Sequence, residues 1–149
     1  MALKSCKGMT MIKYSTDKNF TKEQVKALFD SINWNSGKYP NSLYLALQNS
    51  QTVITAWDED KLVGLTRAID DGAMVAFVHY VLVDPKYQGQ GIASYMMEVL
   101  TKKYKDFLYI DVMPEDKKNA TFYQKFGFKV VDTGLAMSRI NFDKKEETL

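Results

Sequence analysis

The stretch VLVDPKYQGQGIA, residues 81–93, decides the fold of this chain. An apolar run ends at Val83, a polar loop follows, and two glycines precede a new amphipathic segment. Glycine lets the backbone approach a ligand closely, and the first N–H groups of a helix have no intrahelical acceptor. Together with the positive end of the helix dipole, these groups predict an anion site suited to phosphate.

Two familiar phosphate loops do not match this turn. A Walker-type loop requires Gly-Lys-Ser/Thr after its glycines, which is absent. The dinucleotide fingerprint requires glycine or alanine where Ser94 stands, and a turn directly after the strand. The remaining pattern, Gln/Arg-x-x-Gly-x-Gly/Ala, is matched by Gln88, Gly91 and Ala93. On this short pattern alone, a strand–helix loop that binds nothing is an equally good interpretation.

Upstream of the turn, hydrophobic periodicity predicts a short strand, two helices and a three-stranded meander. Thr21 can cap the first helix, whose apolar face runs from Val25 to Ile32. Short acidic turns separate the last three strands, which predicts antiparallel pairing. The expected elements are strand 11–14, helices 21–32 and 42–48, and strands 53–57, 62–69 and 74–83.

Downstream, a helix from about Gly91 to Tyr104 leads to a strand over Phe107–Val112. A strand–helix–strand crossover predicts that these two strands are parallel. A helix over Asn119–Phe126, ended by Gly127, and closing strands 129–132 and 135–142 complete the expectation. The predicted class is α+β, with a mixed sheet and helices on both faces.

Composition predicts one domain over residues 1–149, with 1–8 and 143–149 loosely ordered. A single cysteine, Cys6, excludes an internal disulfide, and with a single histidine it argues against a Cys/His zinc site. The formal charge of +2 does not indicate a nucleic-acid partner. The longest apolar run, 73–83, is too short to span a bilayer, and the start lacks a signal-peptide pattern. We therefore expect a cytoplasmic protein without a membrane partner.

Two motifs in this order resemble the GCN5-related N-acetyltransferase (GNAT) family: VLVDPKYQGQGIASYMMEVL at 81–100 and NATFYQKFGF at 119–128. The resemblance covers roughly residues 52–142, and NSLYLALQNSQTVITAWDEDKLVGLTRAIDDG at 41–72 supports it. This segment is most similar to the branch of plant chloroplast arylalkylamine/serotonin-type acetyltransferases and their bacterial relatives. The resemblance implies a three-layer α/β/α fold with a mostly antiparallel central sheet.

The resemblance also implies acetyl-CoA as co-substrate and no metal. The first motif corresponds to the family's pyrophosphate loop, and a main-chain N–H near Leu82 would face the thioester oxygen as oxyanion donor. Many members have Asn seven residues before the motif tyrosine, where this chain has Asp116, so either Asp116 or Asn119 would contact CoA. The implied cofactor-binding residues are Val81, Leu82, Val83, Gln88, Gly89, Gln90, Gly91, Ile92, Ala93, Ser94, Asp116, Asn119 and Tyr123.

The catalytic candidates are Tyr123, Asp111 and His79. Tyr123 matches the family's general acid, which protonates the departing thiolate; the alternative is a tyrosine packed by its ring. Asp111 matches a carboxylate that some members use as general base, and a solvent-facing strand aspartate is the alternative. His79 could also serve as base, although a lone histidine in a buried strand is more often a core residue.

These residues predict an N-acetyltransferase that transfers acetyl directly to a primary amine of a small molecule or peptide. Neither Cys6 nor a Ser-His pair indicates a nucleophile, so no acetyl-enzyme is required. In this family, Trp34, Tyr39 and Tyr44 would lie near the acceptor groove, although core packing explains them equally well. The alternative function is a non-catalytic CoA-binding regulatory module with the same fold. The oligomeric state is open, and a homodimer is common in the family.

Overall fold

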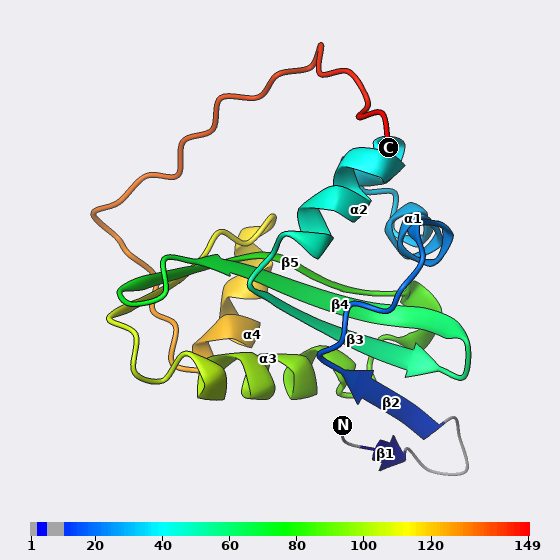
Figure 1. Ribbon diagram of the computed structural model, residues 1–149. Coiled ribbons are helices and arrows are strands. Elements are labelled where there is room, and N and C mark those ends of the chain that lie inside the picture. The colour runs from blue at the N-terminus through cyan, green and yellow to red at the C-terminus, as the bar shows by residue number, and fades with distance from the viewer. Residues whose placement is uncertain (1–2, 6–10) are drawn as a thin grey trace.

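A six-stranded mixed sheet organises the computed structural model, which describes residues 3–5 and 11–149. The strands neighbour one another in chain order (Figure 1). Every neighbouring pair is antiparallel except the last, which is parallel. The predicted α+β class, meander and parallel crossover are thereby confirmed. The strands are β1 (Leu3–Ser5), β2 (Met11–Ser15), β3 (Thr52–Asp58), β4 (Lys61–Asp70), β5 (Val75–Val83) and β6 (Tyr109–Val112).

Helices cover both faces of the sheet (Figure 1). On one face lie α1 (Lys22–Ser31) and α2 (Pro40–Gln48); on the other lie α3 (Ile92–Lys103) and the short α4 (Ala120–Gln124). As predicted, Thr21 caps α1, and it forms a reciprocal capping box with Gln24. Short 3₁₀ turns connect the larger elements: η1 (Asn35–Lys38), η2 (Pro85–Tyr87) and η3 (Lys117–Asn119).

The two faces bury separate apolar clusters. The cluster between α3 and the sheet includes Val78, Val83, Met96 and Leu100. The cluster between the sheet and helices α1 and α2 includes Phe29 and other large side chains. Strand β5 contributes to both clusters, because alternate residues of a strand face opposite sides of its sheet. The strand that carries the quoted motif is therefore held from both sides.

Gly64 on β4 lets α3 lie close to the sheet. A Cβ atom at this glycine would come within 3.0 Å of Ile92 Cγ2 and 3.2 Å of Ala56 Cβ. Ile92 is the first residue of α3, so a Cβ atom at position 64 would force the Ile92 side chain to shift by a few tenths of an ångström. A lone glycine inside a strand pattern typically marks such a close approach.

Strand β5 contains a bulge at His79. Its register with β4 passes from Arg67↔Tyr80 to Ala68↔Val78, which leaves His79 as the extra residue. Both His79 and Tyr80 consequently lie on the α1/α2 side, where their rings are 4.3 Å apart. The parallel register with β6 ends at Val78, so the rest of β5 runs beyond its last partner in β6.

The predicted strands 129–132 and 135–142 are wrong. This segment is an extended arm that leaves the body after α4 and returns toward α2 (Figure 1). Its apolar residues are exposed, with Leu135 at 87% and Phe142 at 81%. Alternating apolar residues favour a strand, but a strand also needs a neighbouring edge, and the arm has none in this conformation.

The sequence predicts that both chain ends are loosely ordered, but each contains residues that form hydrogen bonds with the body of the protein. At the start, Leu3–Ser5 pair with β2, whereas residues 1–2 and 6–8 lie outside the described residues. At the other end, the carboxylate of Glu146 accepts hydrogen bonds from the backbone N–H groups of Asn41 and Ser42, at 3.0 and 2.8 Å. It thereby satisfies donors at the N-terminus of α2.

Candidate active site

Asp84 shapes the loop that follows β5. Its backbone N–H donates to Val63 O at 2.8 Å, and its carboxylate accepts from the N–H of Lys86 at 2.9 Å. The same carboxylate pairs with Lys61 Nζ at 3.2 Å. Gln88 Nε2 then donates to Val83 O at 3.0 Å. The Gln88 side chain therefore ties the loop back to the end of its own strand.

A second anchor holds the middle of this loop. The hydroxyl of Tyr87 donates to the carboxylate of Asp58 at the end of β3, and Lys61 Nζ lies 5.1 Å from the Tyr87 ring centroid. The hydrogen bond to Asp58 is the main reason why the pKa of Tyr87 rises to about 12, so this hydroxyl stays protonated.

The glycines of the loop adopt the backbone conformation that their residue type allows. Gly89 and Gly91 both have φ of +80°, in the left-handed region that other residues rarely adopt. Gly91 is the N-cap of α3, and the first helical bond runs from Tyr95 N to Gly91 O at 3.0 Å. The N–H groups of Ile92, Ala93 and Ser94 precede that bond, so α3 begins with donors directed out of the helix.

The backbone of β5 presents a second set of polar groups. Residues of an antiparallel pair alternately bond their partner strand and point away from it. The backbone N–H of Asp84 bonds Val63 and therefore faces β4. Counting back from Asp84, the backbone of Leu82 also faces β4, whereas that of Val81 and Val83 faces the opposite edge of β5. The Gln88 bond to Val83 O lies on that edge. The outward N–H groups near Leu82 therefore belong to its two neighbours.

These two features fit an extended ligand with a phosphate group. The α3 donors suit an anion, and the edge of β5 beyond β6 can pair with a chain of amide groups as an added strand would. Above Gly89, a Cβ atom would meet nothing within 4 Å, so backbone is open to contact there. The structure thus brings residues 81–83 and 88–94, which the resemblance assigns to CoA, to one end of the sheet.

Tyr123 on α4 is 9% exposed and packs into the α3-side cluster that also contains Val83. Its ring lies 5.0 Å from Phe122 and 5.9 Å from Phe128, both in edge-on geometry. Burial raises the pKa of its phenol, which keeps the hydroxyl protonated at neutral pH. Gly127, with φ of +89°, follows the end of the helix as predicted.

The other catalytic candidates lie on the opposite face. Asp111 on β6 is exposed and registers with Phe77, whose ring stacks on His79 at 5.8 Å. His79 Nδ1 lies 2.6 Å from Nη2 of Arg67. Because a guanidinium only donates, Nδ1 accepts, and a neutral imidazole then carries its proton on Nε2. Burial and, second, the charge of Arg67 lower the pKa of His79, which favours that neutral form.

Arg67 is a buried cation that the sequence reasoning missed. Its side chain projects from β4 onto the α1/α2 face, is 8% exposed, and lies with Cζ 4.6 Å from the centroid of Tyr80. Tyr80 in turn bonds Ser36 at 2.8 Å and contacts Phe29 edge-on. The sequence offered one signal, a charged residue in an otherwise apolar run, LVGLTRAI at 62–69. Its partners come from distant segments and could not be inferred locally.

The aromatic residues expected at an acceptor groove divide in space. Trp34 lies 6.3 Å from the Tyr80 ring and 6.0 Å from Phe29, so it borders the Arg67 region. Tyr44 instead packs edge-on against Phe20 at 6.2 Å. Of these two residues, Trp34 is the one that lies near Arg67 and His79, through the Tyr80 ring.

The two alternatives for a CoA contact before Tyr123 also differ. The carboxylate of Asp116 accepts from Lys118 N at 3.0 Å and pairs with Lys118 Nζ at 3.6 Å, which closes the η3 turn. Asn119 is the N-cap of α4, one helical turn before Tyr123. Asp116 thus has a local structural role, and Asn119 is the one that adjoins the tyrosine helix.

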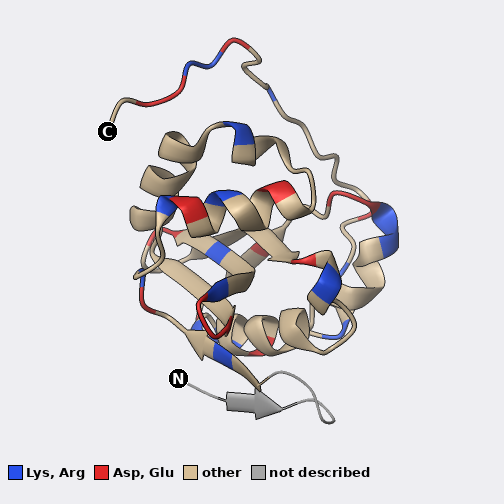
Figure 2. Ribbon diagram, turned by 90° about the vertical axis from the view of Figure 1, so that its right-hand side faces the viewer, with Lys and Arg blue, Asp and Glu red and all other residues tan. Residues whose placement is uncertain are grey.

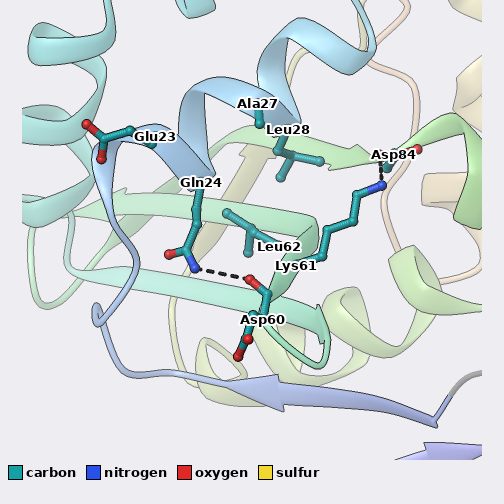
Figure 3. Close-up of a pocket in the computed structure, with 8 residues that line it drawn as sticks. All are labelled: Glu23, Gln24, Ala27, Leu28, Asp60, Lys61, Leu62 and Asp84. Atoms are coloured by element: carbon teal, nitrogen blue, oxygen red, sulfur yellow. Dashed lines mark hydrogen bonds and ion pairs between the residues drawn. The ribbon is translucent and has the colours of Figure 1, made fainter.

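A surface cavity of about 300 Å³ lies between α1 and the β3–β4 turn (Figure 3). Gln24 Nε2 donates to Asp60 O at 3.1 Å on one side, and the Lys61–Asp84 pair closes another. None of the predicted catalytic or CoA-binding residues lines this cavity. It adjoins the glycine loop through Asp84 and through Lys61, which contacts the Tyr87 ring.

Charge is mixed along the surface elements. In Figure 2, Lys and Asp or Glu residues alternate along α1 and along the end of the C-terminal arm. Over the residues that the structure describes, no group of three or more His, Cys, Asp or Glu side chains is arranged to hold a metal ion. No helix in that part of the chain has both the length and the apolar character needed to cross a bilayer.

Comparisons with known proteins identify the family to which this fold and loop belong. The profile of the acetyltransferase (GNAT) family matches residues 15–128, so the chain belongs to that family. A solved GNAT-family acetyltransferase from Streptococcus pneumoniae superposes with a TM-score of 0.75 at 31% identity, over 89% of this chain and 99% of that one. Family membership places the chain among acyltransferases, the enzyme class that the sequence predicted.

Plant proteins are among the curated relatives. The chain is 38% identical over 79 residues to GCN5-related N-acetyltransferase 2, chloroplastic, of Arabidopsis thaliana, covering 52% of this chain and 30% of that protein. It is 31% identical over 124 residues to Histone acetyltransferase TAP1 of Glycine max, covering 74% of this chain and 53% of that protein. The chain thus spans about half or less of the length of these relatives.

Proposed function

We propose that this chain is an acetyl-CoA-dependent N-acetyltransferase that acetylates a primary amine of a small molecule or peptide by direct transfer. The observation that carries the proposal is the juxtaposition of the α3 N–H donors with the outward edge of β5. When bound, acetyl-CoA would supply an acetyl thioester. The proposed partners of the protein are the amine and acetyl-CoA, rather than nucleic acid or a membrane.

The donor-side residues bind and orient. The N–H groups of residues 92–94 hold a pyrophosphate, and the φ of +80° at Gly91 sets their direction. Val81 and Val83 pair through their outward backbone with an amide-containing arm, and the Val81 N–H is a donor for charge that develops on a carbonyl oxygen. Asn119 is assigned to the arm in preference to Asp116, because Asp116 already closes its own turn.

The proton donor in this proposal is Tyr123 Oη. Its buried phenol keeps the proton at neutral pH because burial raises its pKa, and it gives that proton to the departing sulfur. On the other face, we assign the base role to Asp111, which takes a proton from the amine directly or through water. His79 is less suited, because its Nδ1 accepts from Arg67 and its Nε2 then bears hydrogen.

A thiol-release assay with acetyl-CoA and an amine panel tests the proposal. The panel includes arylalkylamines, polyamines and a lysine-containing peptide, since one relative is named for histones. Turnover of at least one amine, together with CoA binding by calorimetry, is expected. Binding without turnover would favour a non-catalytic CoA-binding module, and the absence of both would exclude the proposal. A cytoplasmic location and a homodimer stay predictions.

A further inference from the structure

The guanidinium of Arg67 is buried among neutral partners. Nη1 donates to Ser50 Oγ at 3.3 Å, Nη2 to His79 Nδ1 at 2.6 Å, and the group lies over the Tyr80 ring. Its Nε atom is buried and lacks a hydrogen-bond partner. Among the side chains of residues 11–149, no carboxylate forms an ion pair with it.

The nearest acids along the sheet do not neutralise this charge. Asp70, three residues further along β4, accepts from the Tyr104 hydroxyl on the α3 face, opposite to Arg67. Asp111 faces the same side as His79, but forms no ion pair with Arg67. A buried arginine is ordinarily paired, because an isolated charge is expensive to remove from water. The planar guanidinium matches carboxylate and phosphate groups, which makes an anion the missing partner.

The position of Arg67 connects this charge to the acceptor side of the site. Arg67 registers with Tyr80 on β5, next to the bulge at His79. Val81, the next residue of β5, is the first whose backbone points to the open edge of that strand. His79 is exposed as a residue although its Nδ1 side lies against the buried guanidinium, and its Nε2–H is on the opposite side of the ring. The Nε2–H of His79 is therefore the donor that an anion at the surface can reach, and the positive charge of the buried Arg67 lies behind the ring.

We propose that Arg67 and His79 form an anion subsite that binds a carboxylate or phosphate group carried by the acceptor amine. Asp111, on the same face, is placed to attract the ammonium group of the same molecule. The substrate class that fits is a zwitterionic amine, such as an amino acid or an aminoalkyl phosphate. This inference rests on the proposed function for its assignment to the acceptor, but the anion site itself can be tested without turnover.

The chain has a single histidine, so the imidazole signals in an NMR spectrum belong to His79 alone. Titration of the full chain with acetate or inorganic phosphate should shift these signals and saturate, whereas methylammonium chloride should not shift them. Arg67→Gln should abolish the response. Arg139→Gln is the matched control, because it removes the same charge from the exposed arm and should leave the response intact.

Kinetics on matched substrate pairs then assign the subsite to the acceptor. Phenylalanine is compared with phenethylamine, and phosphoethanolamine with ethanolamine, so the two arms separate a carboxylate from a phosphate. Arg67→Gln should raise KM for the preferred anionic member at least tenfold and change KM for its uncharged counterpart less than twofold. Arg67→Lys, which keeps the charge but loses the planar fork, provides a variant closer to wild type and should show most of the same defect.

Two results would overturn the subsite. One is an unchanged His79 spectrum in the wild-type chain at saturating acetate and phosphate. The other is an equal loss of activity on both members of each pair in Arg67→Lys, which is what a purely structural arginine would cause. If no amine is acetylated and CoA does not bind, the proposed function fails, while the NMR titration still decides whether the anion site exists.

Discussion

The donor side and the acceptor side of the proposed site differ in how they are built. On the proposed donor side, backbone groups would form the site: the glycine loop, the first turn of α3 and the edge of β5 come from the continuous segment 81–94. On the proposed acceptor side, side chains would form it: Arg67, His79 and Asp111 come from three different strands. A backbone site recognises the part of a ligand that many enzymes share, whereas a side-chain site can change with the substrate.

The difference predicts separable effects. Substitutions on the donor face should change the affinity for CoA or the proton transfer to sulfur, and those on the acceptor face should change the KM of the amine. A substitution that changes the CoA affinity and the KM of the amine equally would indicate that the two sides act as one structural unit.

The largest effect is expected for Tyr123→Phe. It removes the proposed proton donor without changing the ring that packs in the core, so kcat should fall by about 100-fold or more while CoA affinity stays within about twofold. Steady-state kinetics and calorimetry measure the two quantities. Tyr109→Phe makes the same chemical change at an exposed tyrosine and should have no effect. Full activity in Tyr123→Phe would remove this residue from the mechanism.

Gly91→Ala should have the next largest effect, on the affinity for CoA. Alanine at φ of +80° is disfavoured by roughly 1–2 kcal/mol, and the strain falls on the N-cap that directs the α3 donors. CoA should bind roughly tenfold more weakly, equivalent to about 1.4 kcal/mol. Gly72→Ala is the matched control, since Gly72 has the same φ in the β4–β5 turn. An equal loss of CoA affinity in both variants would argue against a specific role for the loop.

Tyr104→Phe should lower stability rather than alter the chemistry. The Tyr104 hydroxyl donates to Asp70 at 2.7 Å and lies 2.6 Å from Thr52 Oγ1, which fastens the end of α3 to the sheet. Removing it leaves two polar partners unsatisfied and should decrease the free energy of unfolding by about 1–3 kcal/mol. Urea denaturation measures this change. An unchanged midpoint would show that apolar packing alone holds the helix.

The smallest effect concerns the pH dependence of His79. Burial and Arg67 lower its pKa, so the native state binds a proton less readily than the unfolded chain. The contribution of His79 to stability is therefore present above its unfolded pKa of about 6.5 and lost as pH falls through the lower native value. An NMR titration should give a pKa below 6.5, and Arg67→Gln should raise it. A value above 6.5 in the wild type would contradict the Arg67–His79 contact.

Predictions from sequence succeeded where the determining interactions are local. Thr21 and Gln24 cap α1 within one turn, Gly127 follows the end of α4, and the apolar runs before and after the acidic turns predicted the meander. The same reasoning failed for strands 129–132 and 135–142, whose alternation is typical of a strand. A strand forms only against a partner edge, and the availability of that edge is a property of the folded chain.

By itself, the sequence determined the family, the fold class and the position of the glycine loop that opens α3, because these depend on glycines, capping residues and periodicity within short segments. Only the tertiary structure decided which backbone groups of β5 face outward, how Gly64 lets α3 approach the sheet, and that Arg67 lies buried against His79. The bulge at His79 sets the last of these, since one extra residue changes which side chains share a face.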